Sequence, residues 1–328
     1  MNEFCLNGFG RIGRALFRVA FYDERNVCIH INEPNASIDD IIYFLKYDSL
    51  YANFQATVSK VDEGSFSVEK PTKKWVVSVS HHVDPIEIQI NSIILVDATG
   101  KTSHLNRYER KNRILIFTSS SAEVRNEVIL GLNDSKRKKV KKGEVLSGSI
   151  CDSVAVAPIL GKLMENHAIS QVLITTIHPA LTYQKILDNY VSAGVNRSLG
   201  RQYIHSAIPK RTSLEEVLKR HLDTTNTLIR CISFRVPIES VCSADFTVFF
   251  KDKISYEVVI NELRSLDPRI IGFSHEDLVS IDYKATSVSA TIDMRWLEVL
   301  DDHILKMVIW YDNEWGYSSR INDIIAML

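Results

Sequence analysis

Three glycines near the start of the chain restrict its possible folds more than any other feature. Gly8, Gly10 and Gly13 stand in GxGxxG spacing within the segment NGFGRIGR. Residues 4–7, just before them, are typical of a short buried strand, and residues 11–22 have helical apolar periodicity. A strand, a glycine-rich turn and a helix in this order predict the first unit of a parallel, doubly wound sheet.

The same turn predicts a dinucleotide-binding site. Glycines let the backbone turn tightly and approach a pyrophosphate at the positive end of the helix. Glu33 follows the second predicted strand, 20 residues after Gly13, where a carboxylate binds the hydroxyls of the adenosine ribose. A carboxylate there repels a 2′-phosphate, so NAD is favoured over NADP. The alternative is a glycine-rich turn that binds no ligand.

The distribution of predicted elements divides the chain into two domains. Strands and helices alternate in the first part, with apolar runs at 93–97, 114–118 and 128–132. This pattern predicts an α/β Rossmann domain. After residue 150, long strands dominate and predict an α+β catalytic domain with a mostly antiparallel sheet. We expect the NAD-binding domain at residues 1–149, completed by a C-terminal helix at 316–328, and the catalytic domain at 150–315.

Charge and hydropathy exclude two classes of partner. The formal net charge is -1 over 328 residues, so the chain has no global field that would attract nucleic acid or an acidic membrane. No apolar run approaches the roughly 18 residues that span a bilayer, and the N-terminus has no signal-peptide pattern. The basic run KRKKVKK (136–142) has no interleaved aromatic residue, so we interpret it as a solvated connector.

The cysteines favour a reducing compartment. Cys5, Cys28, Cys151, Cys231 and Cys242 form no CxxC pair and no metal-ligand spacing. An odd, scattered set is unlike a disulfide framework, so we expect a cytoplasmic protein. The adjacent histidines His81 and His82 could suggest a metal site, but no third ligand stands at a fitting spacing. No metal site is predicted.

Cys151 and His178 are the candidate catalytic pair. Cys151 immediately precedes an apolar helical segment, and His178 ends the strand LITTIH. A helix N-terminus favours the thiolate, which predicts a lowered pKa for Cys151. With a nicotinamide cofactor, a thiolate can add to an aldehyde, and the histidine can remove the hydroxyl proton as hydride leaves. The alternative is an inert buried cysteine and a hydrogen-bonded histidine.

Over nearly its whole length the chain resembles the glyceraldehyde-3-phosphate dehydrogenase family. Besides NGFGRIGR, the resemblance rests on LKYDS (45–49), DATG (97–100), SICDSVAVAP (149–158), TTIHPALTYQK (175–185), FRVP (234–237) and WYDNEWGYSSR (310–320). It implies that Cys151 is the catalytic cysteine and His178 the catalytic histidine. The sequences of the segments TTIH and WYDNEWG, together with the acid at Glu33, are somewhat more similar to the erythrose-4-phosphate dehydrogenase branch than to the glycolytic branch.

The resemblance also implies the wider binding site and a homotetramer. Asn313 would hold the nicotinamide carboxamide, and Tyr317 would pack near the ring. The full expected set of cofactor-binding residues is Gly8, Gly10, Arg11, Ile12, Gly13, Glu33, Thr99, Ser119, Asn313 and Tyr317. The expected partner is a small phosphorylated or otherwise anionic aldehyde, with substrate contacts from Arg201, Thr212, Arg235 and Asp152.

The chain departs from the family pattern around the substrate. Ile150 and Asp152 replace hydroxyl residues that flank the family's cysteine, and Leu181 and Tyr183 replace two threonines that hold the substrate phosphate. A carboxylate at Asp152 would repel inorganic phosphate, so we expect water to hydrolyse the thioester and release an acid. Alternatively, the Asp152 side chain points into solvent or caps the helix.

Three other functions are compatible with these motifs. The first is a phosphorylating glyceraldehyde-3-phosphate dehydrogenase. The second is an NAD-binding regulatory protein without turnover, although retention of both Cys151 and His178 argues against it. The third is a reductase that acts on an activated acid.

Overall fold

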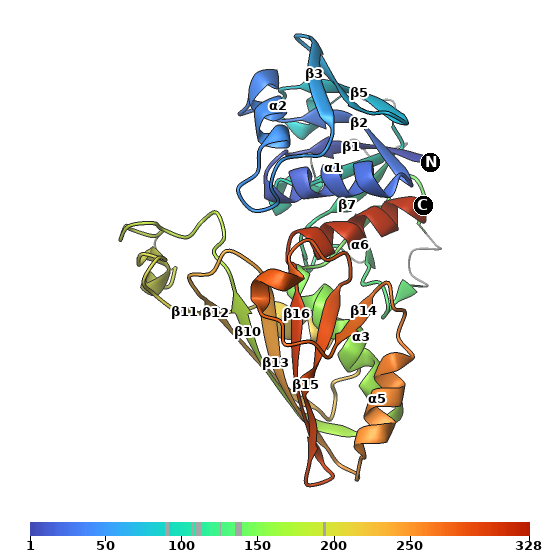
Figure 1. Cartoon of the computed structure of the whole chain (residues 1–328), viewed down its shortest axis with the longest axis vertical. Coiled ribbons are helices and arrows are strands. Elements are labelled where there is room, and N and C mark those ends of the chain that lie inside the picture. The colour runs from blue at the N-terminus through green and yellow to red at the C-terminus, as the bar shows by residue number, and fades with distance from the viewer. Residues whose placement is uncertain (89–91, 107, 109–112, 125, 135–139, 193–194) are drawn as a thin grey trace. The chain divides into compact units, whose positions relative to one another are not determined.

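The computed structural model describes the chain except for residues 89–91, 107, 109–112, 125, 135–139 and 193–194. Two compact units are present, each built on one sheet (Figure 1). The first unit comprises Met1–Ile150 with Tyr317–Leu328, and the second comprises Cys151–Gly316. The predicted domain boundaries differ from these units by one residue at each junction. Most of the basic run, residues 136–139, lies outside the described residues.

The first unit contains a nine-stranded sheet in the order β3-β4-β5-β2-β1-β6-β7-β9-β8. Its strands are β1 (Asn2–Asn7), β2 (Asn26–Asn32), β3 (Thr57–Asp62), β4 (Ser65–Lys70), β5 (Lys73–Ser80), β6 (Ile94–Asp97), β7 (Ile114–Phe117), β8 (Asn126–Glu127) and β9 (Val145–Ser147). All pairings from β5 to β8 are parallel, whereas β3, β4 and β5 form an antiparallel ribbon. The predicted Rossmann architecture is therefore confirmed.

The helices of this unit are α1 (Arg11–Asp23), α2 (Ile38–Lys46) and, from Tyr317 onward, α6 (Trp315–Ala326). Helix α1 buries Phe17 and Phe21, whose rings pack edge-on against Trp75. Helix α6 returns to the start of the sheet, where Asn26 donates a hydrogen bond to the Asn322 carbonyl at 2.8 Å. The C-terminal helix thus completes the first unit.

The apolar run at 128–132 was expected to form a strand, and that expectation is wrong. The neighbouring strand β8 is only Asn126–Glu127, and the apolar residues that follow form a buried turn. Gly131 has φ +86°, and the Leu132 amide donates to the Ile129 carbonyl at 3.1 Å. The turn arises because glycine accepts a positive φ that ends the extended backbone.

The second unit contains a seven-stranded sheet in the order β11-β12-β10-β13-β16-β15-β14. Its strands are β10 (Ile169–His178), β11 (Ile208–Arg211), β12 (Leu228–Arg235), β13 (Cys242–Phe250), β14 (Ile271–Ser274), β15 (Ala290–Leu300) and β16 (Ile304–Tyr311). Only the β10–β12 and β14–β15 pairs are parallel, so the sheet is mostly antiparallel as predicted. Its helices are α3 (Cys151–Asn166), α4 (Leu214–His221) and α5 (Tyr256–Arg264).

Short 3₁₀ helices complete the connections at Pro85–Glu87, Thr102–Asn106, Arg197–Gly200 and Ser280–Tyr283. Among the described residues, no helix combines the length and apolar character required to cross a membrane.

Strand alternation decides where His178 points. Along β10, Val172, Ile174 and His178 are buried, whereas Leu173 and Ile177 are each 39% exposed. Side chains alternate between the two faces of a strand, so His178 lies on the covered face of the sheet. Helix α3 begins at Cys151 itself, which was expected to stand just before the helix, and most of its residues from Asp152 to Leu163 are buried.

Candidate functional site

The glycine-rich turn of the first unit leaves room for a ligand at the start of α1. Gly8 has φ +93°, and a Cβ on it would lie 3.0 Å from the Thr99 amide nitrogen. A Cβ on Gly13 would meet the Gly8 carbonyl oxygen at 2.2 Å, so no side chain fits there. By contrast, a Cβ on Gly10 would meet nothing within 4 Å, and no side chain caps the helix. An open, positively polarised helix end suits a phosphate group.

A cleft of about 250 Å³ lies beside this turn. Its lining includes Gly8, Gly10, Glu33 and Thr99, which the sequence analysis had singled out. These residues follow β1, β2 and β6. The neighbouring strands β2, β1 and β6 are parallel, and at β1 the order in which successive strands are added to the sheet reverses. Dinucleotides bind at this switch point in doubly wound sheets. The cleft therefore lies where the adenosine and pyrophosphate parts of NAD would bind.

Glu33 is held over the glycine-rich turn. Its Oε2 accepts a hydrogen bond from the Phe9 amide at 2.8 Å, and its Oε1 accepts one from the Asn35 amide at 3.1 Å. Both bonds fix the carboxylate at the edge of the cleft. A fixed negative charge there leaves lone pairs for ribose hydroxyls and opposes a 2′-phosphate.

The other expected cofactor residues have contacts of their own. Arg11 forms an ion pair with Asp48 at 2.9 Å, and the Ser119 carbonyl accepts a bond from Ser147 at 2.7 Å. The Tyr317 hydroxyl donates to the Ser149 carbonyl at 3.1 Å within the first unit. Ile12 is partly buried in the first turn of α1, and Asn313 is buried in the second unit. Their roles toward NAD stay predictions.

A buried acid that was not among the predicted site residues lies beside the cleft. Asp97 ends β6 and accepts hydrogen bonds from the Thr99 hydroxyl at 2.6 Å and from Tyr108 at 2.5 Å. His104 Nδ1 lies 3.1 Å from the same carboxyl group. These bonds fix Thr99 at the cleft wall. The DATG segment was the only available signal, and it does not identify the partners of its acid.

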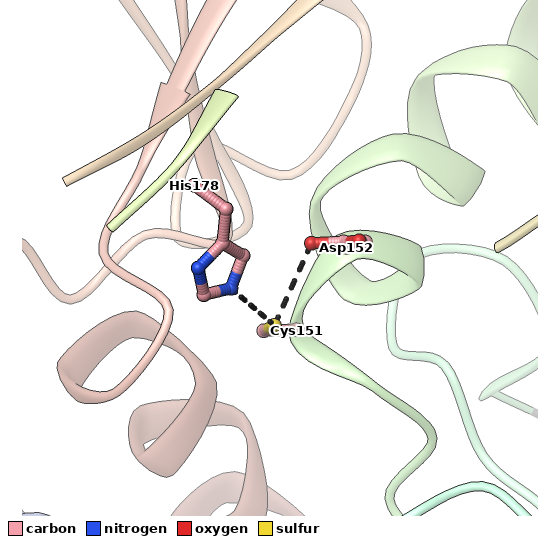
Figure 2. A group of neighbouring side chains, drawn as sticks. All are labelled: Cys151, Asp152 and His178. Carbon is pink, nitrogen blue, oxygen red and sulfur yellow. Dashed lines mark hydrogen bonds between the residues drawn. The ribbon is translucent and has the colours of Figure 1, made fainter. Parts of the chain in front are cut away.

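In the second unit, Cys151, Asp152 and His178 lie together (Figure 2). The Cys151 Sγ atom is 3.9 Å from His178 Nε2 and 3.6 Å from Asp152 Oδ1. Cys151 and Asp152 are the first two residues of α3, and His178 is the last residue of β10. The fold therefore joins a thiol, a carboxylate and an imidazole that are up to 27 residues apart in sequence.

The hydrogen bonds of His178 determine its role. Its Nδ1 lies 2.8 Å from the Pro179 carbonyl oxygen, which can only accept, so Nδ1 carries the proton. Nε2 of the neutral ring then presents its lone pair to the Cys151 sulfur. Burial, aided by the positive charge of Arg235, lowers the pKa of His178 to about 4. A neutral imidazole at pH 7 can accept a proton from the thiol.

Asp152 points into the cluster and is only 4% exposed. Its Oδ1 accepts a hydrogen bond from Tyr311 at 2.8 Å, and its Oδ2 accepts one from Thr212 at 3.2 Å. The alternative in which this side chain points into solvent is therefore wrong. Tyr311 is a partner that the sequence analysis missed, although it belongs to the quoted segment WYDNEWGYSSR.

The predicted lowering of the Cys151 pKa is wrong. Burial raises the pKa of this thiol well above its usual value, and the negative charge of Asp152 raises it further. Arg235 acts in the opposite direction but does not compensate. The resting pair is therefore a neutral thiol and a neutral imidazole, and the helix N-terminus does not decide the protonation state.

A cationic group lies next to this cluster. Arg235 is buried and donates to Ser233 at 3.0 Å and to the Tyr183 hydroxyl at 3.4 Å. Lys210 donates to the same hydroxyl at 3.0 Å. Although burial raises the pKa of Tyr183, the hydrogen bond from Lys210 and the charge of Arg235 lower it overall. Lys210 was not among the predicted site residues.

Arg201 lies in a different environment. Its side chain is 66% exposed and forms an ion pair with Asp188 at 2.9 Å. Arg201 is the residue after the 3₁₀ helix Arg197–Gly200, in the long irregular segment that follows β10. Its expected contact with the substrate stays a prediction.

Comparisons with known proteins give a consistent result over both units. Residues 3–105 match the family model "Glyceraldehyde 3-phosphate dehydrogenase, NAD binding domain", and residues 150–313 match the corresponding C-terminal domain model. A cytosolic glyceraldehyde-3-phosphate dehydrogenase of Antirrhinum majus is 31% identical over 98% of this chain and 96% of its own length. Glyceraldehyde-3-phosphate dehydrogenase 2 of Drosophila melanogaster is 29% identical over 100% of this chain and 99% of its own.

A chloroplastic glyceraldehyde-3-phosphate dehydrogenase of Arabidopsis thaliana is also 29% identical, over 98% of this chain and 77% of its own length. These relatives thus occur in more than one compartment. None of these three carries an erythrose-4-phosphate dehydrogenase name, so the closer similarity to that branch stays a prediction.

The first prediction concerns cofactor choice. The chain should bind NAD at least about tenfold more tightly than NADP, or about 1.4 kcal/mol, because Glu33 opposes a 2′-phosphate. Glu33→Ser should narrow this difference in direct titrations. Glu63→Ser removes the same charge at an exposed turn and should leave the ratio unchanged. Equal affinities of the wild type for both nucleotides would contradict the assignment.

The second prediction concerns the protonation state of Cys151. Asp152→Asn should speed its alkylation at neutral pH, because the carboxylate 3.6 Å from the sulfur opposes thiolate formation. Peptide mass spectrometry would follow the modification over time. Cys231, a partly buried thiol on β12, provides an internal comparison. Burial and the charge of Glu215 raise its pKa more than the charge of Asp152 does, so its rate should rise much less than that of Cys151. An unchanged or slower rate at Cys151 in the variant would show that Asp152 does not control the thiol.

Proposed function

Because this chain belongs to the glyceraldehyde-3-phosphate dehydrogenase family, we propose that it oxidises a small anionic aldehyde and releases a carboxylic acid. Members of this family are NAD-dependent dehydrogenases, and this chain retains both the NAD-binding domain and a cysteine close to a histidine. The observation that carries the proposal is the buried Asp152 carboxylate, 3.6 Å from the Cys151 sulfur. This carboxylate affects whether water or phosphate releases the acyl group from the Cys151 sulfur.

The first half of the reaction uses Cys151 and His178. The sulfur attacks the aldehyde carbonyl carbon while His178 Nε2 takes the thiol proton, and a thiohemiacetal forms. The neutral ring suits this task because its Nδ1 proton is engaged by the Pro179 carbonyl. His178 passes the proton taken from the thiol to the former carbonyl oxygen, which completes the hydroxyl group. It then accepts the hydroxyl proton as the thioester forms and releases it to solvent.

Oxidation of the thiohemiacetal needs a hydride acceptor, which NAD supplies when bound. Gly8, Gly10, Glu33 and Thr99 of the first unit would hold its adenosine and pyrophosphate parts, because they line the cleft at the uncapped end of α1. Asp97 positions Thr99 for this contact through its hydrogen bond at 2.6 Å.

The second half of the reaction must release the acyl group from sulfur. Inorganic phosphate is an anion at pH 7, and a carboxylate about 4 Å away opposes it by about 1–4 kcal/mol, depending on the local dielectric. Water feels no such repulsion. His178 Nε2 can take a proton from an attacking water, so the thioester becomes a carboxylic acid and the thiol is regenerated.

The charge distribution supports an anionic substrate. Arg235 and Lys210 both donate to Tyr183, and the charge of Arg235 acts on the catalytic sulfur as well. Two cations beside the reacting group can bind a phosphate or carboxylate at the far end of a short aldehyde. Thr212, which was expected to contact the substrate, instead supports Asp152.

A phosphorylating reaction is the second candidate. The relatives named above are all glyceraldehyde-3-phosphate dehydrogenases, and the substrate of this chain could be the same aldehyde. In that case Arg235 would have to attract phosphate more strongly than Asp152 repels it.

The third prediction decides between these candidates. Purified protein should reduce NAD with short-chain anionic aldehydes in phosphate-free buffer, and added millimolar phosphate should not raise the rate. The product should be the free acid. Asp152→Thr removes the charge and restores a hydroxyl, so its turnover should increase with phosphate. Cys151→Ser should give no turnover in either buffer. Phosphate-dependent turnover of the wild type with accumulation of an acyl phosphate would establish the second candidate instead.

We also propose that the chain forms the homotetramer that the family resemblance implies. The outer face of the second sheet supports this assembly, because apolar side chains stand there in adjacent strands. Leu173 and Ile177 of β10 are partly exposed, and so are Leu228 and Ile232 of β12, which pairs with it. Burying such a face against another copy removes apolar surface from water.

The fourth prediction tests this assembly. Light scattering should give about four times the 37.3 kDa mass of one chain. Ile232→Asp should lower the particle mass, because it places a charge on the apolar face. Val76→Asp is the matched control, since Val76 is similarly exposed but lies on β5 of the first unit. A wild-type protein of single-chain mass would contradict the proposal.

A further inference from the structure

We propose that Cys151, Asp152 and His178 form a binding site for one zinc ion, which switches the enzyme off reversibly while it is bound. One donor atom from each residue lies within 4.8 Å of the other two. Figure 2 shows the sulfur between the imidazole and the carboxylate. The inference goes beyond the proposed reaction, in which the same residues act without a metal.

The spacing of the donor atoms is close to that of a zinc site. Zinc binds sulfur at about 2.3 Å and nitrogen or oxygen at about 2.0–2.2 Å in tetrahedral geometry, so neighbouring donors lie roughly 3.4–3.6 Å apart. The sulfur of Cys151 is 3.6 Å from Asp152 Oδ1 and 3.9 Å from His178 Nε2. The donor atoms of Asp152 and His178 lie up to 4.8 Å apart, so these two side chains would approach each other by about an ångström to complete the three-ligand set.

Both side chains beside the sulfur are already oriented for a metal. His178 donates Nδ1–H to the Pro179 carbonyl, which leaves the Nε2 lone pair directed at the cluster. Metal-binding histidines commonly make this second hydrogen bond. Tyr311 and Thr212 hold one carboxylate oxygen each, at 2.8 and 3.2 Å, and so restrict the rotation of Asp152. The second hydrogen bonds therefore orient the donor atoms, and the approach of the two side chains is the remaining change that an ion requires.

The donor types select zinc over the hard cations. Sulfur, nitrogen and a single carboxylate suit Zn²⁺ and Co²⁺, whereas Mg²⁺ and Ca²⁺ require mostly oxygen ligands. A thiolate and a carboxylate together balance the two positive charges of the ion. The thiol releases its proton to solvent as the sulfur–metal bond forms, so no oxidant or reductant is required.

Binding of the ion excludes the reaction. The ion would occupy the sulfur lone pair that attacks the aldehyde and the Nε2 lone pair that takes the proton. Three protein ligands leave the fourth position of the ion for water. Asp152 supplies the ligand that a cysteine–histidine pair lacks, so the feature that opposes phosphate also creates the metal site. A chelator should therefore restore turnover.

The fifth prediction tests the site with Co²⁺ as a spectroscopic probe on the full-length, metal-free protein. Titration should give one tight site with a sulfur-to-cobalt charge-transfer band in the near ultraviolet. Asp152→Asn keeps the size of the side chain but removes its charge, and should weaken the affinity at least about 10–100-fold, the loss seen even for outer-sphere partners. Cys151→Ser should abolish the band.

Cys231→Ser is the matched control, because Cys231 is a partly buried thiol outside the cluster and its loss should leave the band unchanged. Circular dichroism would verify that each variant is folded. The proposal is overturned if the wild type gives no band, if Asp152→Asn binds Co²⁺ as tightly as the wild type, or if the band is lost in Cys231→Ser.

The outcome is separable from that of the proposed function, because the band does not depend on turnover. A protein that binds Co²⁺ but oxidises no aldehyde would refute the proposed reaction alone. An active enzyme without the band, unaffected by micromolar Zn²⁺, would refute the metal site alone.

Discussion

The buried carboxylate of Asp152 is the constraint on which the second unit's site depends. An ionised carboxylate is costly to bury unless hydrogen bonds replace its water shell. Tyr311 from the end of β16 and Thr212 just before α4 supply those bonds. Each bond to a charged group contributes about 1.5–3 kcal/mol, and together they tie the first turn of α3 to two other elements. Because Cys151 is the neighbouring residue, the same bonds fix the nucleophile.

The protonation state of the site follows from three competing effects on one sulfur atom. Burial raises the pKa of Cys151 most strongly, Asp152 adds to it, and Arg235 opposes both. The same burial and the same arginine lower the pKa of His178. A neutral pair avoids placing two new charges in a poorly solvated site. The proton therefore has to move as the carbon–sulfur bond forms, which makes His178 a base in the step rather than a partner in a resting ion pair.

The sequence was sufficient for most of the fold because its signals are local. The glycine spacing, the strand before it and Glu33 after it lie within 33 residues, and the structure places them at one cleft. The start of α2 also has a local signal, since Ser37 and Asp40 form a capping box at its first turn. The turn at 128–132 was misread because an apolar run does not reveal the positive φ of Gly131.

The chemistry of the site was less predictable, because it depends on contacts between distant segments. A helix N-terminus suggested a reactive thiolate at Cys151, but burial and a side chain one residue away outweigh that local effect. Nothing in the segment WYDNEWGYSSR indicates that Tyr311 reaches Asp152, 159 residues earlier. For the same reason, no metal-ligand spacing in the sequence predicted the cluster of Cys151, Asp152 and His178. Strand alternation in β10 and the start of α3 bring the three together only in the folded unit. A carboxylate placed there changes two properties at once, since the charge that disfavours a second anion also favours a cation.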